Sequence, residues 1–317
     1  MISRRHRRPQ ISDALPQKTV LRTSKPLRQA THLRLTIPSG RKGLTSPMLI
    51  RIGYDIQFHI LAAVPIVALL NVHPSRDSDL LEPDDLRTEP HVAVERFTDR
   101  FGNTSARIVA PPGQFRLYNS TLIHDSGLPD PQGFDAQEVP VQKLPTDVLL
   151  FLMSSRYCEV DLLVNTAVEL FGAVPKGWPR VLAVCDWVHR NVTFGYKFAS
   201  STRTALGVYT ERIGVCRDFQ HLAITFCRAL NIPARYATGY LGDIGVPPAD
   251  CPMDFSAWFE VYLGDRWWTL DARHNTPRIG RVLMATGRDA TDCAITTSFG
   301  QTSLTKFVVV TDEVKQS

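Results

Sequence analysis

Several signatures of common functional classes are missing from this 317-residue sequence. It contains no Walker-type or dinucleotide-binding glycine loop, no HExxH metal motif and no internal repeat. Its six cysteines form no CxxC pair and show no regular spacing, so we expect neither a disulfide framework nor a zinc site. These absences predict a protein without metal or cofactor that works in a reducing compartment, the cytoplasm.

Long hydrophobic runs are absent as well. The most apolar stretch, residues 60–70, is interrupted by Pro65, whereas a membrane-spanning helix needs about 20 consecutive apolar residues. No apolar segment of the secretory type follows the basic first residues. The sequence therefore predicts no membrane span and no membrane partner.

Acidic residues are scarce in one part of the chain only. Residues 1–47 contain eleven Lys or Arg and a single acid, Asp13, so their formal charge is +10 and the remaining residues carry about −5 of the total of +5. The folded part is therefore acidic and is not expected to bind nucleic acid. The basic segment has no hydrophobic periodicity and is predicted to be disordered. It could be a targeting arm or a nucleic-acid-binding tail, but we favour a translation start at Met48.

Turn clusters divide residues 48–142 into short strand-like runs. The expected strands lie at 51–58, 91–97, 105–109 and 115–123. This spacing predicts a small antiparallel β-sandwich. Residues 143–310 are predicted to form a second, α+β domain, with helices at 145–152, 160–170 and 179–191 and a final strand at 294–299.

A cysteine stands at the predicted start of an amphipathic helix. Cys216 lies within residues 214–219 (Gly-Val-Cys-Arg-Asp-Phe), and Asn-Ile-Pro at 231–233 ends the segment. Apolar residues recur at helical spacing after the cysteine: Phe219, Leu222, Ala223, Phe226 and Leu230. Unpaired N–H groups and the helix dipole favour a thiolate at such a start, so we expect the thiol pKa to fall below about 8.5.

Residues 254–271 read as a β-hairpin around a Gly264-Asp265 turn. Both arms are rich in aromatic and β-branched residues. In the resulting register, Ser256 and Asp271 are diagonal neighbours on one face of the hairpin. A nucleophile on a helix that faces polar groups on adjacent strands is the arrangement that cysteine acyl transfer requires.

Five segments together resemble the core of the microbial transglutaminase-like superfamily, whose fold is papain-like. They are Thr-Arg-Thr-Ala at 202–205, the block at 214–219, Ile-Pro-Ala-Arg-Tyr-Ala-Thr-Gly-Tyr at 232–240, Ala-Trp-Phe-Glu at 257–260 and Trp-Thr-Leu-Asp at 268–271. Residues 99–103 and 110–113 resemble the β-rich region that usually precedes this core. The resemblance covers residues 48–305 and implies an α+β fold, with a papain-like transglutaminase core preceded by a small antiparallel β-sandwich domain.

The resemblance also implies residue roles and a reaction. Cys216 matches the family's nucleophile, Ser256 stands at the position of its histidine base, and Asp271 matches the aspartate that orients the base. The implied activity is that of an amidase, protease or transamidase, which acts on a carboxamide or peptide bond through a cysteine thioester. A peptide or protein substrate follows.

Ser256 departs from the family pattern, since a hydroxyl cannot accept and return a proton near neutral pH as imidazole does. Three hypotheses stay open. His274 could replace the base from the end of the second hairpin strand, provided that this strand ends at or before Arg273. His221 lies about 140° around the helix from Cys216 and is predicted to be structural or solvated. In the third, the protein is a catalytically impaired module that binds a peptide or protein partner.

Arginines gather in the sequence behind the hairpin. They are Arg273, Arg278, Arg281 and Arg288. We expect them to form a solvated face, with contact to an anionic substrate as the alternative.

Overall fold

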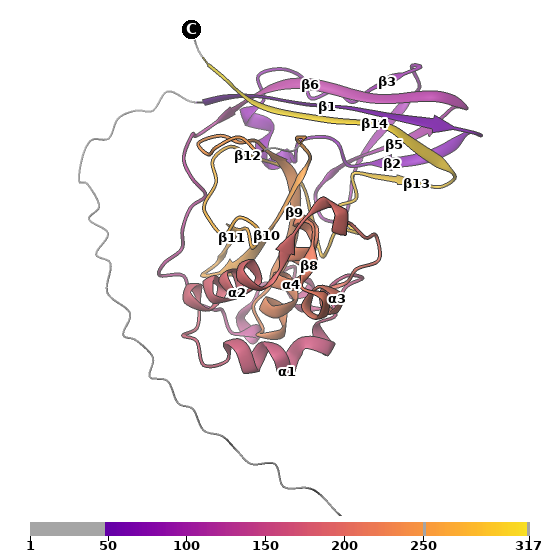
Figure 1. Ribbon diagram of the computed structural model, residues 1–317. Coiled ribbons are helices and arrows are strands. Elements are labelled where there is room, and N and C mark those ends of the chain that lie inside the picture. The colour runs from indigo at the N-terminus through magenta and orange to yellow at the C-terminus, as the bar shows by residue number, and fades with distance from the viewer. Residues whose placement is uncertain (1–47, 250–251, 316–317) are drawn as a thin grey trace, which may run out of the picture. The chain divides into compact units, whose positions relative to one another are not determined.

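The first described strand is the centre of a sheet. The computed structural model describes residues 48–249 and 252–315 (Figure 1), so the predicted basic tail lies outside the described residues. β1 (Met48–Ile60) pairs antiparallel with β6 (Gly113–Asp125) on one side and with β14 (Thr302–Val314) on the other. β3 (Arg87–Glu89) completes the order β14-β1-β6-β3. Alternate β1 residues are buried, as expected for a strand with one face on a core.

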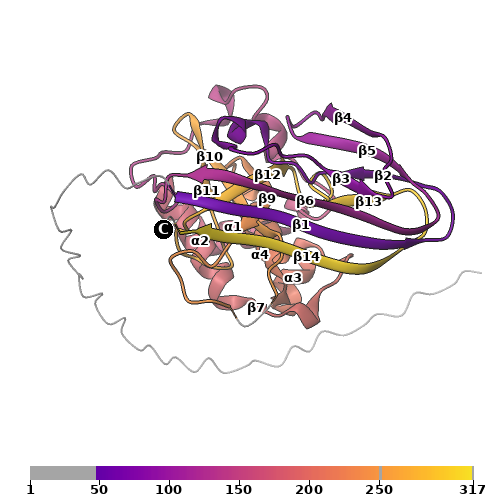
Figure 2. The same ribbon diagram turned by 90° about the horizontal axis from the view of Figure 1, so that it is seen from above.

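A second antiparallel sheet packs beneath the first. Its order is β13-β2-β5-β4, made of Thr296–Ser298, Val64–Ala68, Thr104–Ala110 and Val94–Thr98. Isoleucine, valine and phenylalanine side chains from both sheets share one buried cluster. The two layers lie one over the other in Figure 1, and Figure 2 shows β1, β6 and β14 side by side, nearest the viewer. The predicted sandwich is confirmed, although the strand predicted at 91–97 starts only at Val94.

The sandwich takes two of its strands from the far end of the chain. β13 pairs with β2 and β14 pairs with β1, so the strands beyond residue 295 belong to the sheets of the N-terminal region. The strand predicted at 294–299 forms as β13, but it is not the last strand, and neither it nor β14 joins the sheet of the predicted core 143–310. β14 gave little signal because most of its residues are exposed and only Val309 and Thr311 are buried.

Helices fill the middle of the chain. They are α1 (Val160–Phe171), α2 (Trp178–Asn191), α3 (Ala205–Glu211) and α4 (Cys216–Ala229), with the short strand pair β7 (Thr193–Phe194) and β8 (Ile213–Gly214) between them. The helices predicted at 160–170 and 179–191 are confirmed. The helix predicted at 145–152 is wrong, because only a single 3-10 turn, η3 (Leu149–Leu152), forms there before the chain becomes extended at Met153.

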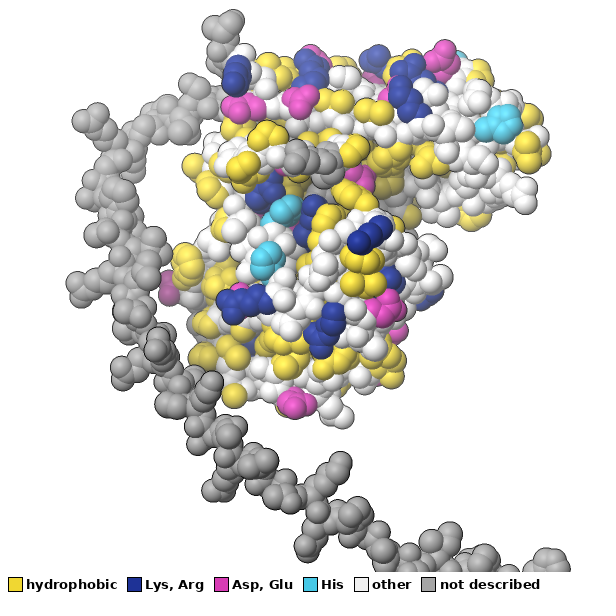
Figure 3. Space-filling view, viewed as in Figure 1, with side chains coloured by type: hydrophobic (Ala, Val, Ile, Leu, Met, Phe, Trp, Pro, Cys, Tyr) yellow, Lys and Arg dark blue, Asp and Glu magenta, His cyan; other side chains and the backbone are white. Residues whose placement is uncertain are grey.

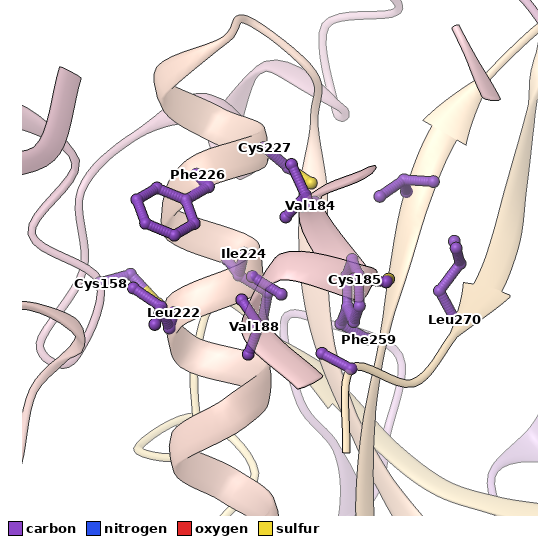
Figure 4. Close-up of a cluster of buried hydrophobic side chains, with 14 of the residues drawn as sticks. Cys158, Val184, Cys185, Val188, Leu222, Ile224, Phe226, Cys227, Phe259 and Leu270 are labelled. Atoms are coloured by element: carbon purple, nitrogen blue, oxygen red, sulfur yellow. The ribbon is translucent and has the colours of Figure 1, made fainter. Parts of the chain in front are cut away.

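α4 is the buried centre of this half of the molecule. Every residue from Asp218 to Leu230 is buried, which includes the predicted apolar stripe. Figure 4 shows Leu222, Phe226 and Cys227 of α4 among residues of α2 and of the strands behind it. Those strands form the sheet β11-β10-β9-β12, made of Arg266–Leu270, Ser256–Leu263, Ala234–Leu241 and Arg281–Gly287. The predicted α+β class is confirmed.

The predicted hairpin forms between β10 and β11. Leu263 pairs with Arg266, and Gly264 and Asp265 both have positive φ, 53° and 71°, as a tight two-residue hairpin turn requires. β11 ends at Leu270, which leaves Asp271 just outside the sheet. Among the described residues, no helix is both long and apolar enough to cross a membrane.

Candidate functional site

A buried carboxylate, that of Asp218, fixes the start of α4. Asp218 accepts a hydrogen bond of 2.9 Å from the backbone N–H of Val215, which satisfies a donor at the helix start. Gly214 makes room for it, since a Cβ there would lie 2.6 Å from the Asp218 Cβ. Arg203 and Arg217 lie within 3.6 Å of the carboxylate and balance its charge. This local packing presents Cys216 as the first residue of the helix.

The Cys216 thiol lies half-buried at the helix start. Burial raises its pKa to about 11, although the Arg273 guanidinium and the Arg217 backbone N–H both act in the opposite direction. The predicted lowering of this pKa was therefore wrong for the protein without substrate, because desolvation outweighs the helix terminus. A thiol of this kind needs a base to become a nucleophile at neutral pH.

His274 reaches the aspartate from the end of the hairpin. Nδ1 of His274 lies 2.8 Å from Oδ2 of Asp271, and the His274 backbone N–H donates to Oδ1 of the same residue over 3.1 Å. This turn forms because β11 ends at Leu270, so the predicted condition for His274 is met. With Nδ1 donating to the carboxylate, Nε2 of the neutral ring keeps its lone pair, and no hydrogen bond between described residues involves it.

Asp271 is buried, and its carboxylate accepts hydrogen bonds from α4, from β12 and from the turn after β11. Gln220 of α4 donates to Oδ1 over 3.1 Å, and Arg281 of β12 donates to Oδ2 over 3.1 Å. Burial alone would raise the Asp271 pKa, but the hydrogen bond from His274 and the charge of Arg281 hold it well below its usual value. Asp271 is therefore a permanent anion beside the His274 ring.

The arginines behind the hairpin do not form the predicted solvated face. Arg281 is 9% exposed and also binds Asp130 through Nε at 2.9 Å, while Arg278 is 6% exposed and donates to the Gly242 carbonyl oxygen. Their sequence spacing gave no sign of these distant partners.

Ser256 lies on β10, whereas His274 and Asp271 follow β11. It is the first residue of β10 and pairs with Gly239 of β9, not with a residue of β11. The predicted diagonal pairing of Ser256 and Asp271 is not part of the sheet, because the β10–β11 pairing ends at Phe259 and Leu270. Ser256 is 7% exposed, and its Oγ has no hydrogen-bond partner among the described residues.

A cleft joins the nucleophile candidate to the histidine. Cys216, Ser256, Arg273 and His274 all line it, and Figure 3 shows His side chains beside Lys and Arg side chains near the middle of this face. A second hollow, lined by Tyr157, Tyr236 and Thr238 among others, adjoins the first at Cys216 and Ser256. The hydrogen bonds of the described residues include none between Cys216 and His274. The structure thus brings three of the four predicted residues to one cleft, with Asp271 behind His274.

His221 has a structural place. It is fully buried, its ring stacks on Tyr157 at 4.9 Å, and Nε2 accepts a 3.1 Å hydrogen bond from the Ala290 backbone N–H. Of the two predicted alternatives, a structural or a solvated histidine, the structure shows the structural one. Burial lowers the His221 pKa to about 3, against the opposing charge of Asp289.

This lowered pKa predicts acid sensitivity. Below about pH 6.5 the unfolded chain binds a proton that the folded chain refuses until about pH 3, so His221 makes the free energy of unfolding decrease as pH falls through that window. His221→Gln keeps an acceptor for Ala290 but does not titrate. Urea titration at pH 7 and pH 5 measures how much the free energy of unfolding decreases between the two pH values. This decrease should be about 2 kcal/mol smaller for His221→Gln than for wild type. Equal decreases in both proteins would contradict this assignment.

Two residues of the site had not been predicted. The Gln220 side chain donates to Asp271 and to the Ala257 carbonyl oxygen, and it accepts from the Ala272 N–H. Arg281 of β12 donates to Asp271. Gln220 follows Cys216 by four residues and so lies on nearly the same helix face, a signal that was available. Among the described residues, no group of three His, Cys, Asp or Glu could hold a metal ion.

Comparisons with known proteins identify the family of the chain. The model of the transglutaminase-like superfamily matches residues 165–272. A solved structure of "a Putative Cysteine Protease from Cytophaga hutchinsonii" is 32% identical, with a TM-score of 0.74, and the match covers 86% of this chain and 93% of that one. An uncharacterized protein from Mycobacterium leprae is 28% identical over 228 residues, which are 66% of this chain and 77% of that protein.

Proposed function

Since this chain belongs to the transglutaminase-like superfamily, we propose that it is a cysteine-dependent acyl-transfer enzyme in which His274 is the base. One observation carries the proposal: the 2.8 Å contact between Nδ1 of His274 and Oδ2 of Asp271, in a histidine that lines the same cleft as Cys216. A carboxylate on Nδ1 fixes the tautomer whose Nε2 can accept a proton. His274 thereby takes the role that Ser256 cannot perform.

The proposed reaction begins with a neutral thiol. Nε2 of His274 removes the proton as the Cys216 sulfur attacks a carboxamide or peptide carbonyl carbon, and Asp271 stabilises the imidazolium that results. The leaving amine takes the proton from His274 as the thioester forms. Water or a second amine then attacks the thioester and releases Cys216. Water makes the enzyme an amidase or protease, and an amine makes it a transamidase.

The cleft supports a peptide or protein as the substrate. It extends to both sides of Cys216, with Arg273 and His274 on one side and Tyr157 and Tyr236 on the other. A chain bound across the cysteine would therefore contact the protein on both sides of the reacting carbonyl. A cytoplasmic location stays a prediction.

A binding module without turnover is the second candidate. It is favoured by the thiol pKa of about 11 and by the missing hydrogen bond between Cys216 and His274. In that case the cleft would hold a peptide or partner protein, and Ser256 would mark a lost base.

Alkylation of Cys216 by iodoacetamide distinguishes the two candidates. General-base help contributes about 10²–10⁴ to a rate, so we expect the wild-type rate at pH 7 to exceed that of His274→Ala by about 10²-fold. Mass spectrometry of the Cys216 peptide measures the rate, and the peptides of the four fully buried cysteines serve as internal references.

His59→Ala is the matched control, because His59 is an exposed histidine on β1 within the sandwich. It should alkylate at the wild-type rate. Equal rates in wild type and His274→Ala across pH 6 to 9 would remove His274 as the base and leave the binding module as the better candidate.

A further inference from the structure

The Ser256 hydroxyl is a buried polar group that the reaction above leaves unused. Its backbone carbonyl oxygen accepts a hydrogen bond of 2.9 Å from the Thr238 hydroxyl, yet its own Oγ is without a partner among the described residues. A buried hydroxyl without a partner destabilises the fold. Such a group in a cleft is explained if a ligand satisfies it.

Ser256 lies where the two hollows of the cleft meet. The hollow on the His274 side and the hollow on the Tyr157 side are both lined by Cys216 and by Ser256. A carbonyl group that approaches the Cys216 sulfur from either hollow therefore comes next to Ser256. Ser256 is therefore a candidate contact for the reacting group itself.

The site needs a second donor for the oxygen of that carbonyl. When sulfur attacks, the carbonyl oxygen becomes an anion, and enzymes stabilise it with hydrogen-bond donors fixed in advance. The N–H of Cys216 can be one donor, since the first residue of a helix has no intrahelical acceptor for it. Among the described residues that line these hollows, Ser256, Arg217 and Arg278 each have a buried side-chain donor without a hydrogen-bond partner, and of these only Ser256 lines both hollows.

We propose that the Ser256 hydroxyl is an oxyanion donor in the acylation of Cys216. The inference rests on the proposed function. The sulfur forms a bond to the carbonyl carbon, the π electron pair moves to the oxygen, and Ser256 Oγ–H and Cys216 N–H donate to that oxygen. When the pair returns, the bond to the leaving group breaks and the leaving group takes the proton held by His274. Ser256 donates a hydrogen bond throughout and transfers no proton, so a hydroxyl suffices where a base would not.

Two reagents that attack the same sulfur differently test this role. p-Nitrophenyl acetate acylates Cys216 through an oxyanion and releases p-nitrophenolate, whereas iodoacetamide alkylates it by direct displacement at carbon without one. Removing one oxyanion donor costs about 10²–10³ in rate. We expect Ser256→Ala to acylate about 10²-fold more slowly than wild type and to be alkylated within twofold of the wild-type rate. Ser256→Thr, which keeps the hydroxyl, should acylate within about tenfold of wild type.

The alkylation arm also shows that the variants keep a folded site. Equal acylation by wild type and Ser256→Ala would overturn the proposal, and so would a parallel fall of acylation and alkylation, which would mean that Ser256 acts on the thiol. Cys216→Ala is the third arm. If Cys216→Ala releases p-nitrophenolate as fast as wild type, both the acyl-transfer function and the role of Ser256 are wrong. If Cys216→Ala is inactive but Ser256→Ala acylates like wild type, only the role of Ser256 is wrong.

Discussion

Asp271→Asn should lower the rate of Cys216 acylation by about 10²–10⁴-fold, because it disables the base through which Asp271 acts. In the protein, Oδ2 of Asp271 accepts from Nδ1 of His274. An Asn amide presents its NH₂ to the same ring nitrogen, which favours the tautomer with the proton on Nε2. That nitrogen can then no longer accept the proton of Cys216. Acylation by p-nitrophenyl acetate at pH 7 measures the effect.

The same substitution should also lower stability in a pH-dependent way. Since the folded pKa of Asp271 lies below its unfolded value, its charge stabilises the fold fully above about pH 5, and this contribution is lost as pH falls through the unfolded value near 3.8 and below. Hydrogen bonds to a charged group are worth about 1.5–3 kcal/mol each, so we expect Asp271→Asn to lose about 2–4 kcal/mol at pH 7. In urea titrations the difference between the two proteins should begin to shrink only below about pH 4, and most of it should remain at pH 3.

Asp265→Asn in the hairpin turn is the matched control. Asp265 has a φ of 71°, a conformation that Asn also adopts readily, and it takes no part in the cleft. We expect wild-type acylation and a stability within about 0.5 kcal/mol of wild type. An Asp271→Asn protein that is folded and retains a tenth of the wild-type acylation rate would show that the aspartate does not orient the base.

Gly239→Ala should destabilise the protein more than most single substitutions. A Cβ at this position would lie 2.1 Å from the Val282 carbonyl oxygen and 3.0 Å from the Met284 backbone nitrogen. Both atoms belong to β12, and β10 pairs with the other side of β9, so the backbone has no free direction in which to move. We expect a loss of about 3 kcal/mol or more in the free energy of unfolding, measured by urea titration.

The matched control is Gly207→Ala in α3. Its new Cβ would meet the flexible Arg203 side chain at 3.3 Å, and alanine is favoured over glycine within a helix by about 0.5–1 kcal/mol. We expect little change or a small gain in stability. Similar urea midpoints for Gly239→Ala and wild type would contradict the close approach of β9 and β12 at this residue.

Local patterns predicted the elements that carry the nucleophile and the hairpin turn. The helical stripe after Cys216 and the Gly-Asp turn each depend on neighbours in sequence, and both formed as predicted. The fold class and the family followed from motifs that lie mainly on α4, β9, β10 and β11.

Long-range contacts set the limit of what the sequence predicts. Where β11 ends decides whether His274 meets Asp271, and nothing in the sequence marks Leu270 as its last residue. Arg281 reaches Asp130 across 151 positions, so its burial could not be predicted from the charges beside it. The predicted lowering of the Cys216 thiol pKa was wrong for the same reason, because the burial of Cys216 depends on segments far from its helix.

The return of β14 to β1 has a consequence for synthesis. A ribosome makes β1 early and β14 near the end, so one edge of β1 has no neighbour while the residues between them are being made. An unpaired strand edge invites pairing with other chains. Until β14 emerges and closes the sheet, this edge of β1 is therefore a place where the nascent chain can pair wrongly.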